Sequence, residues 1–243
     1  MKAVILCAGF GTKLYPITSD RPKQLLPVGD RPILDRILDR LQPIDRLDQV
    51  YIVTNERFYP HFQSWFDEQD HELQLELVND ESTTQEERLG AIRDIEYVID
   101  EKDIQEDLLV IAGDNLLEFE LTDFVSFSDE HGTSVGIKEM EGGEVGSYSI
   151  VQMADDHRIV DFQEKPAAPR QSTISIGLYL FKHKHLIKIR EYLDGDRNPD
   201  EPGYLIQWLH KQVPVYGFRF DGPWYDIGDI TSYNEANAYF EQR

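Results

Sequence analysis

Residues 6–34 read L-C-A-G-F-G-T-K-L-Y-P-I-T-S-D-R-P-K-Q-L-L-P-V-G-D-R-P-I-L. Residues 1–31 carry five basic side chains against two acidic ones, in a chain whose formal net charge is −22. Gly9 and Gly11 leave space for backbone N–H groups to approach phosphate oxygens, and Thr12 adds a hydroxyl donor. A glycine-rich turn with lysines beside it, in a protein that is otherwise anionic, attracts polyphosphates. We therefore interpret this segment as a binding site for a nucleoside triphosphate.

The segment from Ala8 to Arg31 is long for a connection between a strand and a helix. Loops of more than about 12 residues are usually functional or disordered, and four prolines in or next to this one favour function: Pro16, Pro22, Pro27 and Pro32. The segment is not a Walker loop, because it lacks Gly-Lys-Ser/Thr. It also lacks the dinucleotide fingerprint, because Leu14 occupies the position of the third small residue. An NAD-dependent dehydrogenase is therefore disfavoured.

The composition indicates a soluble protein with one α/β domain. A length of 243 residues suits a single domain with a sizeable core. No apolar run approaches the roughly 18 residues of a membrane span, and we expect no membrane partner. The N-terminus has no secretory signal, which predicts a cytoplasmic location. Cys7 is the only cysteine, which excludes an internal disulfide and a multi-cysteine zinc site.

The acidic excess bears on the partners of this protein. It has 46 acidic residues against 24 basic ones, which argues against nucleic acid, because phosphate backbones bind basic surfaces. The same excess suits a protein that works in concentrated salt, where electrostatic interactions are screened within about 3 Å at 1 M. An acidic enzyme without salt adaptation is the other interpretation.

Apolar runs rich in β-branched residues alternate with helical patterns, which indicates βαβ units around a mainly parallel sheet. In residues 1–132 we predict strands at 3–7, 50–54, 73–78 and 108–112, and helices at 32–41, 58–66 and 86–99. In residues 133–243 we predict strands at 134–138, 147–152, 159–164, 174–181 and 213–220, two helices before the last of these, and a closing helix. The second half is therefore a mixed-sheet extension of the first.

The pattern Gly9-x-Gly-Thr-Lys-Leu-x-Pro-x-Thr-x-x-x-Pro-Lys-Gln-Leu-Leu-Pro27 resembles the signature of the sugar-phosphate nucleotidylyltransferases, which include the glucose-1-phosphate thymidylyltransferases. Four further motifs follow in the order of that family: 112–115, 164–166, 177–179 and 224–228. The resemblance implies a Rossmann-like three-layer nucleotide-diphospho-sugar transferase fold with a mainly parallel mixed central sheet. It also implies a single domain, with a nucleotide-binding half at 1–132 and a sugar-binding half at 133–243.

The resemblance assigns the charged residues. Lys13 and Lys23 are expected to hold the substrate phosphates as catalytic residues, although the family usually has arginine in place of Lys13. Asp114 and Asp226 match the metal-binding aspartates of the family and would hold Mg²⁺, which commonly takes one or two carboxylates plus phosphate oxygens. Each follows an apolar segment, so we expect a parallel sheet to bring both to one carboxyl-end crevice. Without the resemblance, a solvated lysine and a turn or cap aspartate would be the ordinary interpretations.

The sugar and base contacts are assigned in the same way. In the family the Glu-Lys pair, here Glu164 and Lys165, holds the sugar hydroxyls and phosphate, and a surface ion pair is the alternative. Tyr148 and Gly177 would also contact the sugar, although Gly177 could instead mark a bulge, and Ser149 replaces the usual glycine. The remaining nucleotide contacts are Ala8, Gly9, Gly11, Thr12, Gln24, Gln85 and Gly90. Gln24 and Gln85 favour dTTP or UTP, and Gln85 could instead cap a helix.

The sequence thus predicts a Mg²⁺-dependent enzyme that makes a nucleotide-sugar from a nucleoside triphosphate and a sugar 1-phosphate. The alternative is a catalytically silent, nucleotide-sensing regulatory protein on the same fold. We expect a monomer or a small homo-oligomer, because little chain follows the motif at 224–228.

Overall fold

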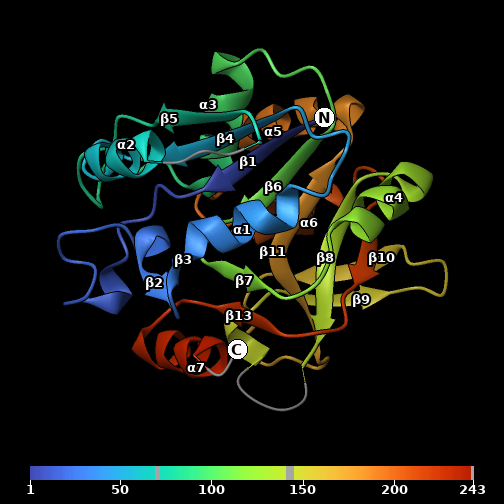
Figure 1. Cartoon of the computed structure of the whole chain (residues 1–243). Coiled ribbons are helices and arrows are strands. Elements are labelled where there is room, and N and C mark those ends of the chain that lie inside the picture. Colours follow the sequence, from blue (N-terminus) through green and yellow to red (C-terminus); the bar gives the residue numbers. More distant parts are fainter. Residues whose placement is uncertain (69–71, 141–144, 242–243) are drawn as a thin grey trace.

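The computed structural model describes residues 1–68, 72–140 and 145–241 (Figure 1). Within these residues, nine strands form one mixed sheet with helices packed on both faces. The side chains of β1 (Lys2–Leu6) alternate between the two faces: Ala3 and Ile5 join one hydrophobic core, and Val4 joins the other. This confirms the predicted three-layer fold with its mixed, mainly parallel sheet.

The sheet contains strands from both halves of the chain. Its order is β10 (Ile159–Gln163), β9 (Ile150–Met153), β11 (Thr173–Phe181), β6 (Leu108–Ala112), β1, β4 (Gln49–Thr54) and β5 (Leu75–Asn79), with β8 (Ser134–Glu139) beside β11 and β12 (Tyr216–Arg219) beside β8. Strands β6, β1, β4 and β5 are parallel, and β11 runs antiparallel to β6. The carboxyl ends of the parallel strands therefore meet at one edge.

Seven helices of four residues or more lie within the described residues. They are α1 (Ile33–Leu41), α2 (Tyr59–Asp67), α3 (Ala91–Glu101), α4 (Thr122–His131), α5 (His183–Asp194), α6 (Pro202–Leu209) and α7 (Ile230–Phe240). Apolar residues of α1, α2 and α4 lie in the same core as Ile5, and those of α3, α5 and α6 lie in the core with Val4. None of these helices is both long and apolar enough to cross a bilayer.

Several local features differ from the sequence-based predictions. The predicted helix at 86–99 begins only at Ala91, because Gly90 has a φ of 93° that a helix cannot continue through. Helix α4 was not predicted. Two short strands, β7 (Asn115–Leu117) and β13 (Trp224–Asp226), form a separate antiparallel pair, and β2 (Pro27–Val28) pairs with β3 (Arg31–Pro32). These elements lie around the segments that the sequence singled out for function.

Gly177 sits at a bulge in β11. Its φ is 68°, and the register with β8 shifts between Ser175 and Tyr179. A Cβ at Gly177 would lie 3.0 Å from the Cβ of Ala112. Gly177 therefore marks a bulge, which is one of the two interpretations given above.

Gly177→Ala is expected to lower the free energy of unfolding by about 1–3 kcal/mol, because a Cβ is strained at positive φ and crowds the end of β6. Urea denaturation measures this loss. Gly146→Ala is the matched control, since a Cβ there meets nothing closer than 3.6 Å. If Gly177→Ala is as stable as Gly146→Ala, the strain assigned to this position is absent.

Candidate active site

The glycine-rich turn follows β1 and is fixed from the neighbouring strand. Asn55, buried at the end of β4, donates from Nδ2 to the Ala8 carbonyl oxygen at 2.8 Å. Gly11 has a φ of 64°, and its carbonyl oxygen accepts a hydrogen bond from the Thr18 hydroxyl at 2.7 Å. A Cβ at Gly9 would meet no atom within 4 Å. The turn is therefore held firmly at its ends while its backbone at Gly9 faces open space.

Two single-turn 3-10 helices follow in this loop. Thr12–Leu14 places Lys13 at an exposed position, and Lys23–Leu25 places Lys23 at the end of β6. The Lys23 ammonium lies 2.6 Å from Oδ2 of Asp114, and its side chain is 14% exposed. Lys23 is therefore a half-buried, paired cation, and the solvated alternative does not describe it.

Asp114 is positioned by a close approach between β1 and the residue after β6. A Cβ at Gly113 would lie 2.6 Å from the Leu6 carbonyl oxygen and 2.7 Å from Sγ of Cys7. Only glycine allows this approach, which brings Asp114 beside the start of the glycine-rich turn. The Gly-Asp pair thus has a geometric reason in addition to any chemical one.

Asp226 reaches Asp114 by a route that the sequence did not predict. We expected both aspartates at the carboxyl end of a parallel sheet, and for Asp226 this is wrong. Asp226 ends β13, which pairs antiparallel with β7 and places it opposite Asn115. The Ile227 N–H also donates to the Asp114 carbonyl oxygen at 3.0 Å. A small second sheet, rather than the main one, brings the two carboxylates together.

Asp226 is buried among several charged side chains. Burial and the neighbouring Asp114 carboxylate raise the pKa of Asp226 to about 7, while Lys23, Lys13 and Lys165 oppose this shift. Two carboxylates and three lysines therefore converge here. The described residues contain no cluster of three or more His, Cys, Asp or Glu side chains that could hold a metal. Two repelling carboxylates fit Mg²⁺, which completes its octahedron with waters and phosphate oxygens.

Glu164 and Lys165 directly follow β10, and the Lys165 charge acts on Asp226. The Glu164 side chain is 3% exposed, and its carboxylate accepts a hydrogen bond from the Ser149 hydroxyl. Burial raises the pKa of Glu164, and the Ser149 hydroxyl and Lys165 oppose that shift. The Lys165 ammonium lies 2.5 Å from Oε1 of Glu201. The burial of Glu164 excludes the alternative of an ordinary surface ion pair.

Tyr148 links the two sides of the site. Its ring packs edge-on against Trp224 of β13, with centroids 5.5 Å apart. The Trp224 indole N–H donates to Oδ1 of Asn115 at 3.0 Å, and Nδ2 of Asn115 donates to the Ile176 carbonyl oxygen at 2.6 Å. Burial, with Asp226 nearby, raises the pKa of Tyr148 to about 12. Asn115 thus joins β7, β11 and β13, a role that sequence reasoning missed although Asn115 stands in a quoted motif.

Comparison with known proteins places the chain in a family. The sequence profile described as "Nucleotidyl transferase" matches residues 2–243. The chain belongs to the nucleotidyl transferase family. The bifunctional protein GlmU of Methanocaldococcus jannaschii is 30% identical over 242 residues, which make up 98% of this chain and 54% of that protein. This nucleotidyl transferase therefore spans about half the length of the GlmU protein that it matches.

Two further comparisons agree with this family. The UTP–glucose-1-phosphate uridylyltransferase of Synechocystis sp. is 28% identical over 249 residues, covering 97% of this chain and 62% of that protein. A solved structure of UDP-glucose pyrophosphorylase complexed with UDP-glucose superposes with a TM-score of 0.83 at 22% identity, covering 100% of this chain and 99% of that one. At that identity the structural likeness shows the fold.

The residues proposed to read the base lie in two places. Gln24 is 3% exposed, lies against Gly113 and has an Oε1 atom without a hydrogen-bond partner within the described part of the chain. Gly90 packs instead against the loop before α6, where a Cβ would lie 2.7 Å from the Pro199 carbonyl oxygen. That carbonyl oxygen accepts from the Ile92 N–H at 2.8 Å. Gln85 precedes this point in a turn and is partly exposed.

A buried acid pair lies next to that turn, and sequence reasoning missed it. Asp80 follows β5, and its Oδ1 atom accepts from the N–H and hydroxyl of Ser82 at 2.8 and 2.7 Å. Burial raises the pKa of Asp94, on α3, well above its usual value, and the Asp80 carboxylate adds to this shift. Burial and the repulsion between the two carboxylates therefore both favour the protonated form of Asp94.

Asp94→Asn is expected to raise the free energy of unfolding at pH 8 by about 1–2 kcal/mol, because the amide keeps a donor for Asp80 and cannot ionise. The folded protein holds the Asp94 proton more tightly than the unfolded chain. Wild-type stability therefore falls as pH rises above the usual carboxyl range, and the variant escapes that fall. Urea unfolding at pH 5 and pH 8 measures the difference, with exposed Asp123→Asn as the control. A variant destabilised equally at both pH values contradicts the assignment.

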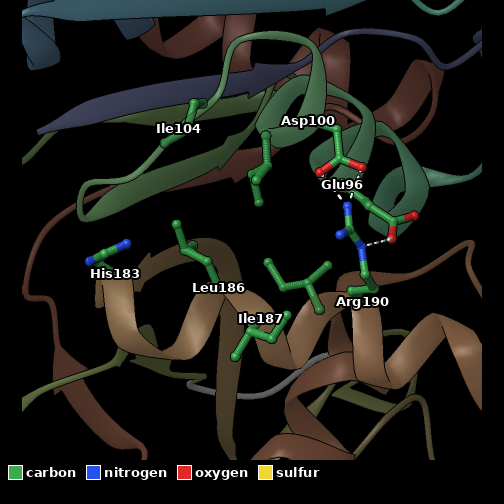
Figure 2. A pocket seen from close by; sticks show the side chains of 9 residues that line it. Glu96, Asp100, Ile104, His183, Leu186, Ile187 and Arg190 are labelled. Atoms are coloured by element: carbon green, nitrogen blue, oxygen red, sulfur yellow. Dashed lines mark hydrogen bonds and ion pairs between the residues drawn. The ribbon is translucent and has the colours of Figure 1, made fainter.

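A hollow between α3 and α5 is lined by none of the proposed site residues (Figure 2). Its floor is apolar, with Leu186 and Ile187 projecting from α5, and its volume is about 200 Å³. At its rim Arg190 is already paired with Asp100 and Glu96. Because the Arg190 guanidinium is already neutralised by two carboxylates, this apolar hollow does not suit a triphosphate.

Proposed function

We propose that this nucleotidyl transferase moves a nucleotidyl group from a nucleoside triphosphate to a sugar 1-phosphate. A phosphate oxygen of the sugar 1-phosphate attacks the α-phosphorus in line, the bond from that phosphorus to the bridging oxygen breaks, and pyrophosphate leaves. The observation that carries the proposal is the meeting of Lys23, Asp114 and Asp226 beside the glycine-rich turn.

The proposed roles follow from the charges. A phosphate monoester has a second pKa of about 6, so the nucleophile is already anionic and needs no general base. What the reaction needs is alignment of two polyanions that repel each other. Backbone N–H groups from Ala8 to Thr12 would hold the phosphates, with Lys13 and Lys23 as cations. Mg²⁺ held by Asp114 and Asp226 would neutralise charge on the leaving pyrophosphate.

The two substrates would lie on the two halves of the domain. We assign the nucleotide to residues 1–132 and the sugar 1-phosphate to residues 133–243, where Glu164, Lys165, Tyr148 and Gly177 are the proposed contacts. Gln24 beside Lys23 resembles the thymidylyl members of the family, and the buried Gln24 amide has an acceptor oxygen without a hydrogen-bond partner in the described part of the chain. The UTP named for one relative agrees with this. We therefore favour dTTP or UTP.

The test is an assay of pyrophosphate release. The protein is incubated with Mg²⁺, each nucleoside triphosphate and a panel of hexose and N-acetylhexosamine 1-phosphates. Release with one pair, and none when the sugar 1-phosphate is omitted, is the expected result. If no pair gives release while a nucleoside triphosphate still raises the melting temperature, the nucleotide-sensing regulatory protein is the correct interpretation.

A further inference from the structure

Ser149 and Glu164 face each other across two neighbouring strands. Ile150 of β9 pairs with Gln163 of β10 in the antiparallel register. Ser149 and Glu164 continue those strands by one residue each, so they stand opposite one another at the strand ends. The Ser149 hydroxyl donates to Oε2 of Glu164, and Ser149 is 8% exposed. The contact is a buried hydrogen bond to a carboxylate, a class that contributes more than a neutral pair.

Helix α6 closes the other side of the carboxylate. A Cβ at Gly203 would lie 1.6 Å from Oε2 of Glu164 and 2.6 Å from the Ser149 hydroxyl oxygen. The Glu164 N–H donates to Oε1 of Gln207 on the same helix at 2.8 Å. Glycine at 203 leaves room for the carboxylate in this position. Oε2 is therefore enclosed, and Oε1 is the oxygen on the side of Lys165, 3.9 Å from its ammonium.

We propose that Ser149 is a positioning residue for sugar recognition: it holds Oε2 of Glu164, so that Glu164 accepts a sugar hydroxyl through Oε1 alone. This inference rests on the proposed function and adds to it a determinant of sugar specificity. A glycine at 149, usual in similar enzymes, has no hydroxyl to hold Oε2 and leaves the carboxylate free to rotate. Ser149 thus fixes the direction in which Oε1 faces the sugar, and the site favours a sugar with a hydroxyl group in that direction.

The test compares Ser149→Ala with the wild type, using the sugar 1-phosphate that gives the fastest pyrophosphate release. Loss of a hydrogen bond that holds a substrate-binding carboxylate corresponds to a loss of about tenfold or more in substrate affinity. We expect the KM for the sugar 1-phosphate to rise about tenfold, with the KM for the nucleoside triphosphate within twofold of wild type. The acid limb of kcat/KM should also move to higher pH, because Glu164 loses a donor to its charged form.

The controls separate positioning from folding. Ser149→Thr keeps the hydroxyl and should restore the KM, and Ser149→Cys covers the case in which alanine does not fold. Ser128→Ala removes a buried serine hydroxyl on α4 that bonds the Phe124 carbonyl oxygen, and it should leave both KM values unchanged.

Three outcomes are informative. Equal rises in both KM values, or an unchanged pH profile, overturn the positioning role. An active wild type with an unaltered Ser149→Ala refutes this inference alone. A wild type that turns over no substrate pair refutes the proposed function itself.

Discussion

Lys23→Ala is expected to lower kcat by about 10²–10³ or more, with the fold intact. Lys23 is a preorganised cation whose ammonium lies 2.6 Å from Asp114 and whose side chain is 14% exposed. A preorganised cation stabilises the transition state far more than a mobile surface lysine does, because it needs no reorganisation when negative charge shifts to the leaving group. Steady-state pyrophosphate release at saturating substrates measures kcat, and circular dichroism reports the fold.

Two matched lysine variants sharpen this test. Lys13→Ala removes an exposed lysine from the same loop, and we expect a smaller loss, since a mobile ammonium is less preorganised. Lys184→Ala removes a lysine at the start of α5 and should leave kcat unchanged. Near-normal turnover by Lys23→Ala would show that the triphosphate is held by other groups.

The main sheet could be predicted from the sequence because its parallel strands are buried on both faces. Such strands are continuous apolar runs, as at Leu108–Ala112, and the helices between them carry apolar residues at helical spacing. Helix α4 carries no such signal: Thr, Ser, Phe and Val fill most of Thr122–Ser128, and these are modest helix formers. Its packing in the core, with Phe124 buried, makes it helical.

The candidate site could be predicted as a set of residues and not as an arrangement. The motifs named Lys23, Asp114 and Asp226, but the pairing of β7 with β13 that joins the aspartates links segments about 110 residues apart. Three-residue strands leave no periodic pattern. Asn55 and Asn115 were missed for a related reason, since each acts on the backbone of a distant segment.

Asp226→Asn is expected to make the protein more stable and nearly inactive. The Asp226 carboxylate is buried and stands beside the Asp114 carboxylate. Burial and this repulsion together raise the pKa of Asp226 to about 7. At pH 8 the folded protein therefore carries a buried charge that the unfolded chain would hydrate. Removing that charge should raise the free energy of unfolding by about 2 kcal/mol in EDTA. The same change removes one proposed ligand of Mg²⁺, and kcat should fall by about 10² or more.

The stability gain of Asp226→Asn should depend on the solution conditions. In EDTA it should shrink as pH falls through 7, because the wild-type carboxyl takes up a proton and the repulsion disappears. Asp229→Asn is the matched control on the same segment: its carboxylate is exposed and caps α7, which lowers its pKa, so no gain is expected. Added Mg²⁺ should reduce the difference in free energy of unfolding between Asp226→Asn and the wild type, because it binds only the folded wild type. If Asp226→Asn is less stable than the wild type at pH 8, the Asp226 carboxylate stabilises the fold. The prediction that this carboxylate lowers stability while it supports catalysis would then be wrong.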